Sequence, residues 1–335
     1  MQVKFIMNYN RIVVTGGCGF IGSNFIKLLN RKFPNVKIFN IDKLTYAGNP
    51  KNLSEFKIIS NYNFHKLDIA SNDISVIFKT IKPDLVVNFA AESHVDKSLE
   101  NSYEFLRTNI IGTSNLILAS RENKVKRYIQ VSTDEVYGDL SYEDPAFTEK
   151  TNLNPSSPYS VSKASADMLV KSYFRSFDFP MIITRCSNNY GPYQYPEKLI
   201  PLVISKILEN KKIPVYGKGD NIRDWIYVED HCNAILEVIH KGRIGETYNI
   251  GGNSEISNLD LVKMIIIELG ETPEDLIQFV ADRPGHDFRY AIDNSKILNE
   301  IGWVPKNNFK QGLQKTIRWY LDNSDWLSDL TGNKK

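Results

Sequence analysis

Tyr159 and Lys163 are a pair of side chains whose types and spacing suggest proton transfer. They lie four residues apart at the start of a stretch with helical character, residues 160–177, so both project from one helix face. A free tyrosine titrates near pH ~10, and a neighbouring ammonium group favours its phenolate form. The pair is a candidate catalytic base, although the YxxxK spacing is frequent by chance and depends on its surroundings.

Two adjacent acids form a second candidate for proton transfer. Asp134 and Glu135 come with Thr133 directly after residues 127–132, a β-branched run that predicts a strand. A parallel sheet places its ligand site at the carboxyl ends of its strands, where this segment emerges. Most adjacent acid pairs are exposed loop residues, but this pair emerges at the edge of the sheet where such a fold places its chemistry.

A glycine-rich turn predicts a dinucleotide site. Gly16, Gly19 and Gly22 follow a strand predicted at 11–15 and open a helix predicted at 22–32. Such a turn lets backbone amides approach a pyrophosphate, and the helix aims its amino terminus at the phosphates. Asp42 lies 20 residues after Gly22 at the end of the next strand, where a carboxylate accepts bonds from a ribose and repels a 2′-phosphate. We therefore expect NAD rather than NADP.

The elements that position these residues alternate between strands and helices. Further strands are predicted at 37–41, 63–67, 85–89 and 181–184, and a further helix at 103–123. This alternation predicts an α/β protein with a Rossmann-type, doubly wound parallel sheet.

A smaller C-terminal substrate-binding lobe is expected after the sheet. From about residue 190 the chain becomes rich in glycine and proline, with one strand predicted at 248–250 and one helix at 259–269. We assign residues 1–189 to the NAD-binding domain, with a returning segment around 225–255. The lobe then comprises residues 190–224 and 256–335.

Composition limits the classes of partner. The 335 residues include 41 Lys and Arg against 39 Asp and Glu, a net charge of +2, which argues against nucleic-acid and anionic-membrane partners. The apolar runs fall short of the ~20 residues that span a bilayer. Three distant cysteines, Cys18, Cys186 and Cys232, fit a reducing cytoplasm. The five histidines show no metal-ligand spacing, so no metal site is expected.

Five segments carry a resemblance to a known family. TGGCGFIGSNF, NFAAESHVDKS, VSTDEVYGD, YSVSKASAD and RCSNNYGPYQYPEKLIP resemble the extended short-chain dehydrogenase/reductase family, in register from about residue 11 to about residue 320. Within it the chain is similar to the nucleotide-sugar 4,6-dehydratases. The Asp134–Glu135 pair is the most discriminating feature, because 4-epimerases of the same family generally lack it.

The resemblance implies a hydro-lyase with a tightly bound, recycled NAD. In such enzymes Tyr159 takes the C4 hydroxyl proton of a hexose while NAD takes the C4 hydride, which makes the C5 proton acidic. Thr133 contacts the same oxygen, and Lys163 lowers the Tyr159 pKa and binds the nicotinamide ribose. Glu135 then removes the C5 proton, Asp134 protonates the departing C6 hydroxyl, and the hydride returns to C6. The 4-keto-6-deoxy product belongs to deoxysugar biosynthesis, for example of rhamnose.

The resemblance also implies which residues bind the cofactor and which bind the substrate. The cofactor set is Gly16, Gly19, Phe20, Ile21, Gly22, Asp42, Lys43, Thr45, Asp68, Ile69, Ala90, Ala91, Thr108, Tyr159, Lys163 and Cys186. The substrate set is Ser93, His94, Asn188, Glu197, Lys198, Leu199, Pro214, Tyr216, Arg223, Asn258, Arg283 and His286. Within it, Arg223 and Arg283 are expected on the diphosphate, because guanidinium groups bind phosphate oxygens in pairs.

Alternatives remain open at this point. The nucleotide is expected to be dTDP-glucose first and UDP-glucose second. The choice stays open because Asn221 and Phe288-Arg289 depart from the usual pattern of the nucleotide lobe, and because UDP-glucose 4,6-dehydratases share almost the same motifs. A 4-epimerase and a non-catalytic NAD-binding scaffold are less favoured functions. Relatives commonly dimerise through the helices corresponding to 103–123 and 160–177, so a homodimer is expected.

Overall fold

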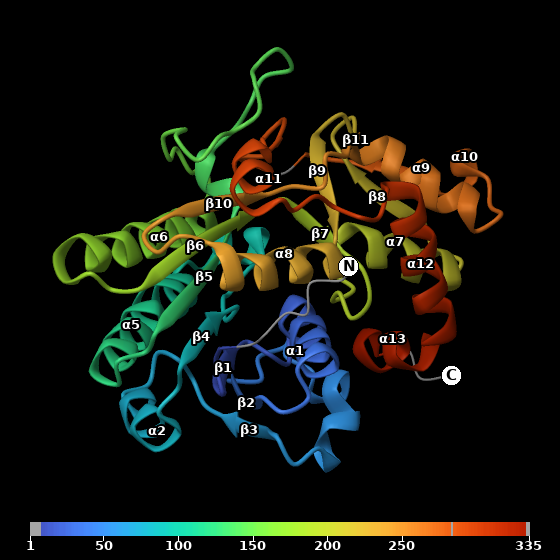
Figure 1. Ribbon diagram of the computed structural model, residues 1–335. Coiled ribbons are helices and arrows are strands. Elements are labelled where there is room, and N and C mark those ends of the chain that lie inside the picture. Colours follow the sequence, from blue (N-terminus) through green and yellow to red (C-terminus); the bar gives the residue numbers. More distant parts are fainter. Residues whose placement is uncertain (1–7, 283, 333–335) are drawn as a thin grey trace.

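The centre of the molecule is a seven-stranded parallel sheet (Figure 1). The structure is a computed structural model that describes residues 8–282 and 284–332. In spatial order the strands are β10 (Thr247–Ile250), β6 (Met181–Cys186), β5 (Arg127–Thr133), β4 (Leu85–Asn88), β1 (Arg11–Thr15), β2 (Lys37–Asp42) and β3 (Tyr62–Lys66). The strand order reverses between β1 and β4, the point at which a doubly wound sheet binds ligands. The predicted Rossmann-type fold is confirmed.

Helices cover both faces of the sheet because successive strand residues point to opposite sides. Ile12 and Val14 of β1 belong to one apolar cluster with α1 (Phe20–Lys32) and α8 (Val228–Lys241). Val13, between them, belongs to the cluster on the other face. The helices of that face are α2 (Asp73–Ile81), α5 (Thr113–Glu122) and α6 (Pro158–Phe177).

The predicted helices are confirmed, with differences at their ends. Helix α6 starts at Pro158, two residues early, because Pro at the first turn and a capping box between Ser157 and Ser160 favour that start. The stretch predicted at 103–123 consists of α4 (Tyr103–Phe105), a π-helical segment η2 (Leu106–Gly112) and α5. π-helical turns are often found at functional sites.

A second, smaller core lies beyond the carboxyl end of β6. Its sheets are β7 (Asn188–Tyr190), β9 (Ile222–Tyr227) and β11 (Glu255–Ser257), and β8 (Ile213–Tyr216) with β12 (Ile277–Val280). Its helices are α7 (Leu199–Leu208), α9 (Asn258–Glu268), α10 (Pro273–Leu276), α12 (Phe309–Asp322) and α13 (Ser324–Thr331). Helix α11 (Ser295–Ile301) packs instead against α8 in the core of the large sheet. The boundary between the two lobes stays a prediction.

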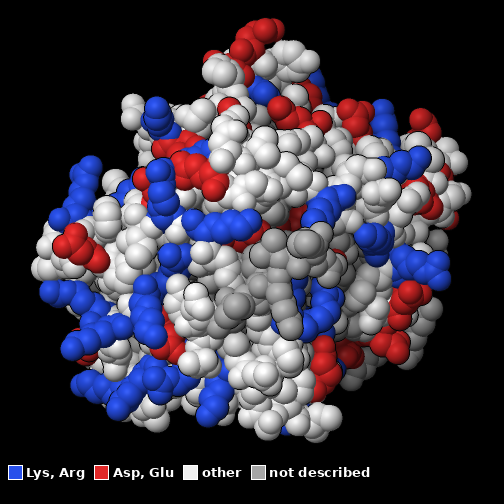
Figure 2. All heavy atoms as spheres, viewed as in Figure 1, with Lys and Arg blue, Asp and Glu red and all other residues white. Residues whose placement is uncertain are grey.

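Charged side chains of both signs cover the face shown in Figure 2, and basic ones gather at its lower left. Exposed lysines and arginines of α2, α5 and the turns that follow them include Lys79, Lys82, Arg121, Lys124 and Lys126. The last two lie between α5 and the start of β5, at the amino edge of the sheet, opposite the ligand edge. Across residues 8–282 and 284–332, no helix has the length and apolar character needed to span a membrane.

Candidate active site

The first cavity follows the carboxyl ends of the central strands, and the structure brings every predicted cofactor and catalytic residue to its wall. These residues are Gly16, Gly19, Phe20, Ile21, Gly22, Asp42, Lys43, Thr45, Asp68, Ile69, Ala90, Ala91, Thr108, Thr133, Asp134, Glu135, Tyr159, Lys163 and Cys186. Their individual contacts with a ligand remain predictions. The cavity lies at the strand-order reversal, where the fold favours a dinucleotide.

Gly16 follows β1 and touches the segment after β4. Its φ of +68° is in the left-handed region, and a Cβ atom there would lie 2.7 Å from the backbone nitrogen of Ala90. Gly22 has a related constraint, because its Cβ would lie 2.3 Å from the Gly16 carbonyl oxygen. Two of the three predicted glycines are therefore required by the close approach of backbone segments.

Asp42 ends β2 and holds the glycine-rich loop as well as lining the cavity. One carboxylate oxygen accepts a bond from the Cys18 amide at 2.9 Å, and the other accepts from the Leu44 amide at 2.8 Å. Burial raises the pKa of Asp42, and these two amides oppose that rise. Each carboxylate oxygen retains a lone pair, so a ribose hydroxyl group can still be bound.

Two buried hydroxyl groups at the cavity wall indicate a polar ligand. Thr108 Oγ1, in η2, and Ser132 Oγ, at the end of β5, have no hydrogen-bond partner among the described residues. Buried polar groups are nearly always paired, so an unpaired one beside a cavity suits a ligand that carries hydroxyl or amide groups. Together with the glycine loop and Asp42, these groups fit NAD.

Lys163 and Tyr159 are both buried on α6. The Lys163 ammonium donates to the Val131 carbonyl oxygen of β5 at 2.8 Å, and burial lowers its pKa. The Tyr159 pKa, which we expected Lys163 to lower, is instead raised well above its usual range, by burial first and then by Glu135. Burial and Glu135 therefore act against the phenolate form, and the effect expected of Lys163 on Tyr159 stays a prediction.

The segment Thr133–Glu135 places an acid and a base side by side at the end of β5. The turn η3 (Asp134–Tyr137) is capped by the Thr133 hydroxyl, which accepts from the Glu135 amide at 3.3 Å. Asp134 is 1% exposed, and burial followed by Glu135 raises its pKa well above the usual range. Asp134 is thus held neutral and able to donate a proton, while the half-buried Glu135 faces the cavity.

Cys186 is fixed by residues that the sequence analysis missed. Its thiol donates to the Ser132 carbonyl oxygen, and the Asn189 amide donates to its sulfur at 3.3 Å. Burial raises the pKa of Cys186 to about 12, so the thiol acts as a small apolar filler. The Asn189 oxygen accepts in turn from Nδ1 of the fully buried His231 at 2.8 Å. Asn189 lies within the quoted RCSNNYGPYQYPEKLIP motif, from which the sequence predicted Cys186, Asn188, Glu197, Lys198 and Leu199 as site residues but not Asn189.

The second cavity adjoins the first and contains most of the predicted substrate residues. They are His94, Asn188, Glu197, Lys198, Leu199, Pro214, Tyr216, Arg223, Asn258 and His286. Ser93 lines the first cavity instead, because it precedes the bend into α3 (Val95–Glu100), and Arg283 lies outside the described residues. Glu135 lines both cavities, which places it where the two ligands would meet.

The guanidinium group of Arg223 is held in place from one side. It donates to the carbonyl oxygens of Asp287 at 2.8 Å and Phe288 at 3.1 Å, and it lies 4.3 Å from the ring centre of Tyr290. Tyr290 also lines the cavity and was missed from the sequence. Asn221 supports the same segment, since its amide donates to the Asp287 carbonyl at 3.2 Å. The diphosphate contact predicted for Arg223 stays a prediction.

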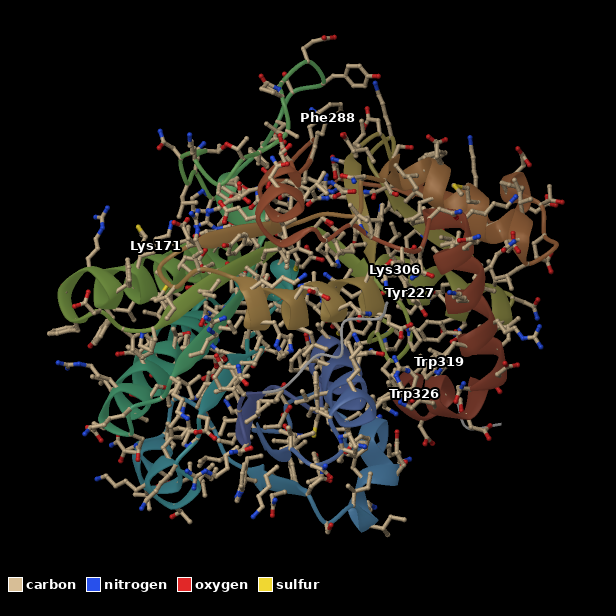
Figure 3. All side chains as sticks on the ribbon, in the orientation of Figure 1. Lys171, Tyr227, Phe288, Lys306, Trp319 and Trp326 are labelled. Carbon is tan, nitrogen blue, oxygen red and sulfur yellow. The ribbon has the colours of Figure 1, made fainter. Side chains whose placement is uncertain are left out.

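Phe288 and Arg289, which depart from the family pattern, lie behind the wall of the substrate cavity. Phe288, labelled in Figure 3, is not among the described residues that line either cavity, and its amide donates to Asp139 at 2.6 Å. Arg289 forms a two-point ion pair with Glu255, at 2.6 and 3.1 Å. Both residues hold loops together, so neither departure alters the described wall of the substrate cavity.

Glu197 is already engaged by groups from the NAD-binding side. Tyr46 donates to one of its carboxylate oxygens at 2.8 Å, and His94 and Lys97 lie 3.5 and 3.7 Å from the other. The role predicted for Glu197 at the nucleotide base stays a prediction. The structure adds a second role, since Glu197 joins the loop after β2 to the loop before α7.

Within residues 8–282 and 284–332, no group of three or more His, Cys, Asp or Glu side chains could hold a metal ion. Side chains that can act as acids, bases and hydrogen-bond donors line the two cavities. A neutral acid, a carboxylate and a phenol–ammonium pair converge on one space, and such a set suits proton transfers at adjacent carbons.

Comparisons with known proteins agree with this geometry. The model of the GDP-mannose 4,6 dehydratase family matches residues 13–316. The dTDP-glucose 4,6-dehydratase of Neisseria meningitidis serogroup B is 48% identical over 340 residues, covering 96% of each chain. The Bacillus anthracis dTDP-glucose 4,6-dehydratase in complex with NAD has a TM-score of 0.89 at 49% identity, covering 95% of this chain and 99% of that one.

More distant structures share the fold. The dTDP-glucose 4,6-dehydratase DesIV of Streptomyces venezuelae, with NAD and TYD bound, has a TM-score of 0.92 at 42% identity, covering 96% of this chain and 99% of that one. A UDP-glucose 4-epimerase of Thermotoga maritima has a TM-score of 0.86 at 28% identity, covering 93% and 99%. Sequence identity is higher with the dehydratases than with this epimerase.

Proposed function

The chain belongs to the GDP-mannose 4,6 dehydratase family, and from this premise we propose that it converts dTDP-glucose to dTDP-4-keto-6-deoxyglucose with NAD. The membership confirms the resemblance read from the five motifs. The observation that carries the proposal is the pairing of a neutral Asp134 with Glu135 where the two cavities adjoin. An enzyme of this kind is a hydro-lyase.

The order of the steps follows from the acidity of the sugar. The C5 proton of glucose is not acidic until C4 is a ketone, so oxidation at C4 precedes the loss of water across C5 and C6. Bound NAD would supply the hydride acceptor for C4 and the hydride donor for C6. Glu135 returns a proton to C5 as C6 is reduced, and the proton taken by Tyr159 offsets the one that Asp134 loses. The reaction is therefore redox-neutral, and one water leaves per turnover.

Three side chains carry the proton transfers, and a fourth contacts the reacting oxygen. Tyr159, in its phenolate form, takes the C4 hydroxyl proton, and the Thr133 hydroxyl group contacts the same oxygen. Glu135 removes the C5 proton, and Asp134 supplies a proton to the C6 hydroxyl group as it departs as water. A positioned acid or base typically contributes about 10²–10⁴-fold to the rate. The neutral state of Asp134 supports its role as the acid, because an ionised carboxylate has no proton to give.

The nucleotide occupies the second cavity in this proposal. Arg223 binds the diphosphate from its fixed orientation, and Tyr216, 43% exposed at the cavity wall, stacks on the base. We place dTDP before UDP because the relatives of about half-identical sequence are dTDP-glucose 4,6-dehydratases. Thymine and uracil differ by one methyl group, worth only about 1 kcal/mol on burial.

We propose a homodimer that forms through the stretch 103–122 and through α6. Large apolar side chains are exposed there: Tyr103, Leu106, Ile111, Leu118, Val161, Met168 and Phe177. Exposed apolar side chains gathered on neighbouring elements mark protein interfaces. Met168→Glu should give a monomer by light scattering, whereas Val76→Glu, at an exposed apolar position of α2, should leave the dimer intact.

The proposal also covers the use of the product and the compartment in which the reaction takes place. A 4-keto-6-deoxy sugar nucleotide is the product class from which deoxysugars such as rhamnose are made. The three cysteines are buried free thiols, which suits a reducing compartment, and we place the enzyme in the cytoplasm.

The direct test is mass spectrometry of dTDP-glucose and UDP-glucose, each incubated with the purified protein and NAD. Loss of one water supports the dehydratase, and the ratio of initial rates assigns the nucleotide. Glu135→Gln, of the same shape, should abolish both water loss and solvent deuterium uptake at C5. Unchanged mass with conversion to a galactose isomer would instead show a 4-epimerase. Unchanged sugar in a folded, NAD-bound sample contradicts the proposal.

A further inference from the structure

The centre of the glycine-rich loop is held from behind. All backbone polar groups of Cys18 are bonded: its amide donates to Asp42, and its carbonyl oxygen accepts from the Asn49 amide and the Asn52 side chain, each at 3.0 Å. Cys18 itself is not among the described residues that line the cavity. Asn49 and Asn52, at the start of the 3-10 helix η1 (Pro50–Ile58), therefore fix the rear of the loop that faces the ligand.

Trp326 of α13 sets the orientation of Asn52. Its indole nitrogen donates to the Asn52 side-chain oxygen at 2.8 Å. An indole N–H can only donate, so the oxygen of the amide must face Trp326 and the NH₂ group must face Cys18. Asn52 is 1% exposed, so water has little access to replace either bond.

The C-terminal helices are seated on this part of the molecule by further contacts. Lys51 of η1 forms an ion pair with Asp329 of α13 at 2.5 Å. Trp326 packs edge-on against Trp319 of α12, with ring centres 5.2 Å apart. Figure 3 shows both tryptophans on the side of α12 and α13 that faces α1. Helix α13 thus contacts η1 through an ion pair and a hydrogen bond, and it contacts α12 through an aromatic pair.

The same two helices also hold a second wall of the cofactor cavity. The Tyr320 hydroxyl of α12 donates to the Gln194 carbonyl oxygen at 2.6 Å, and Gln194 lines the cavity. The preceding residue, Tyr193, has a φ of +71°, uncommon for a bulky side chain, and its ring lies 4.6 Å from that of Trp319. The helix pair α12–α13 therefore contacts the cavity's supports from two directions.

We propose that Trp326 is a positioning residue for NAD, which acts through Asn52 and Cys18 to keep the glycine-rich loop in its binding conformation and so slows NAD release. The inference rests on the proposed function, because in that redox-neutral reaction one cofactor molecule must serve both the oxidation at C4 and the reduction at C6. A cofactor that left after C4 oxidation would strand an oxidised sugar. Slow release is thus a requirement of the chemistry.

The test compares two matched changes in one aromatic cluster. Trp326→Phe keeps an aromatic ring and removes the N–H group that donates to Asn52. Trp319→Phe is the control: it makes the same change in the neighbouring ring, whose indole makes no hydrogen bond to η1 among the described contacts. NAD retained per protomer after gel filtration, and its release rate on dilution, are measured together with the melting temperature. A buried acceptor left unpaired should make Trp326→Phe release NAD about tenfold faster, with Trp319→Phe within about twofold of the parent.

A second variant keeps the inference testable if Trp326→Phe does not fold. Asn52→Asp preserves the bond to Trp326 but turns an oxygen toward the Cys18 carbonyl, so NAD release should again accelerate. Unchanged release from folded Trp326→Phe overturns the inference, as does equal acceleration by Trp319→Phe. A parent protein that binds no NAD overturns the proposed function itself, and this inference with it.

Discussion

Thr133 donates a hydrogen bond to one carboxyl oxygen of Asp134 at 3.2 Å, and the second oxygen has no partner among the described residues. Because burial and the adjacent Glu135 raise the Asp134 pKa, the proton sits on this unpaired oxygen. One hydroxyl group therefore orients the carboxyl group and leaves its proton free for a substrate. The base lies one residue further along the chain.

Replacing Asp134 by Asn should separate catalysis from binding. Asparagine has the same shape and keeps the bond from Thr133 but has no acidic proton, so kcat should fall about 10²–10⁴-fold with KM nearly unchanged. Steady-state rates of water loss from dTDP-glucose measure this. Glu143→Gln, at an exposed acid in the following loop, is the control and should match the parent. A kcat within about threefold of the parent would remove Asp134 from the mechanism.

His231 should make the fold sensitive to acid. Burial lowers the pKa of His231 to about 3, whereas the unfolded chain binds this proton near pH ~6.5. Stability from the neutral imidazole is full above pH ~6.5 and declines as pH falls toward 3, by up to about 1.4 kcal/mol per pH unit. His231→Gln keeps a donor toward Asn189 and does not titrate. Chemical denaturation at several pH values should show a shallower decline for the variant; parallel curves contradict the prediction.

Gly16→Ala should abolish NAD binding rather than merely weaken the fold. The substitution combines a φ of +68° with a Cβ atom 2.7 Å from the Ala90 nitrogen. Gly270→Ala is a matched control, because Gly270 has a φ of +82° but a Cβ atom added there would meet nothing within 4 Å. The control should lose roughly 1–2 kcal/mol of unfolding free energy and retain NAD. NAD content after gel filtration distinguishes the two variants. Equal NAD retention by both would show that the close approach of Gly16 to Ala90 is not required for NAD binding.

Arg223→Lys should weaken substrate binding while leaving the chemistry intact. A lysine cannot reproduce the donors that the guanidinium group directs at the Asp287 and Phe288 carbonyls, nor present a fork to a diphosphate. KM for dTDP-glucose should rise about tenfold, about 1.4 kcal/mol, with a smaller change in kcat. Arg318→Lys, with a side chain 83% exposed, should show no effect. A fall in kcat without a rise in KM contradicts this assignment.

Much of the NAD-binding half could be predicted from local sequence. Strands β1 and β4–β6 are buried β-branched runs, and Gly16, Gly22 and Asp42 follow them at positions fixed by the topology of the sheet. The Asp134–Glu135 pair was placed correctly at a strand end for the same reason. Periodicity and spacing work here because each residue is close in sequence to the element that positions it.

Features that depend on distant contacts could not be predicted. His231 reaches Asn189 across 42 positions, and Tyr290 reaches the Arg223 guanidinium from another segment, so no local pattern marks either residue. Burial raises the pKa of Tyr159, and spacing shows the nearby Lys163 but not this burial. These properties depend on tertiary packing, which local patterns in a single sequence do not reveal.

The bond between Trp326 and Asn52 joins residues 274 positions apart. A ribosome adds about 5–20 residues per second, so roughly 14–55 s separate the synthesis of these two partners. For that interval the nascent amino-terminal strands and their glycine loop lack the helix that secures them from behind. The nucleotide-binding half therefore waits for α13 to leave the ribosome before its loop is complete, so coenzyme capture comes well after the loop itself has been synthesised.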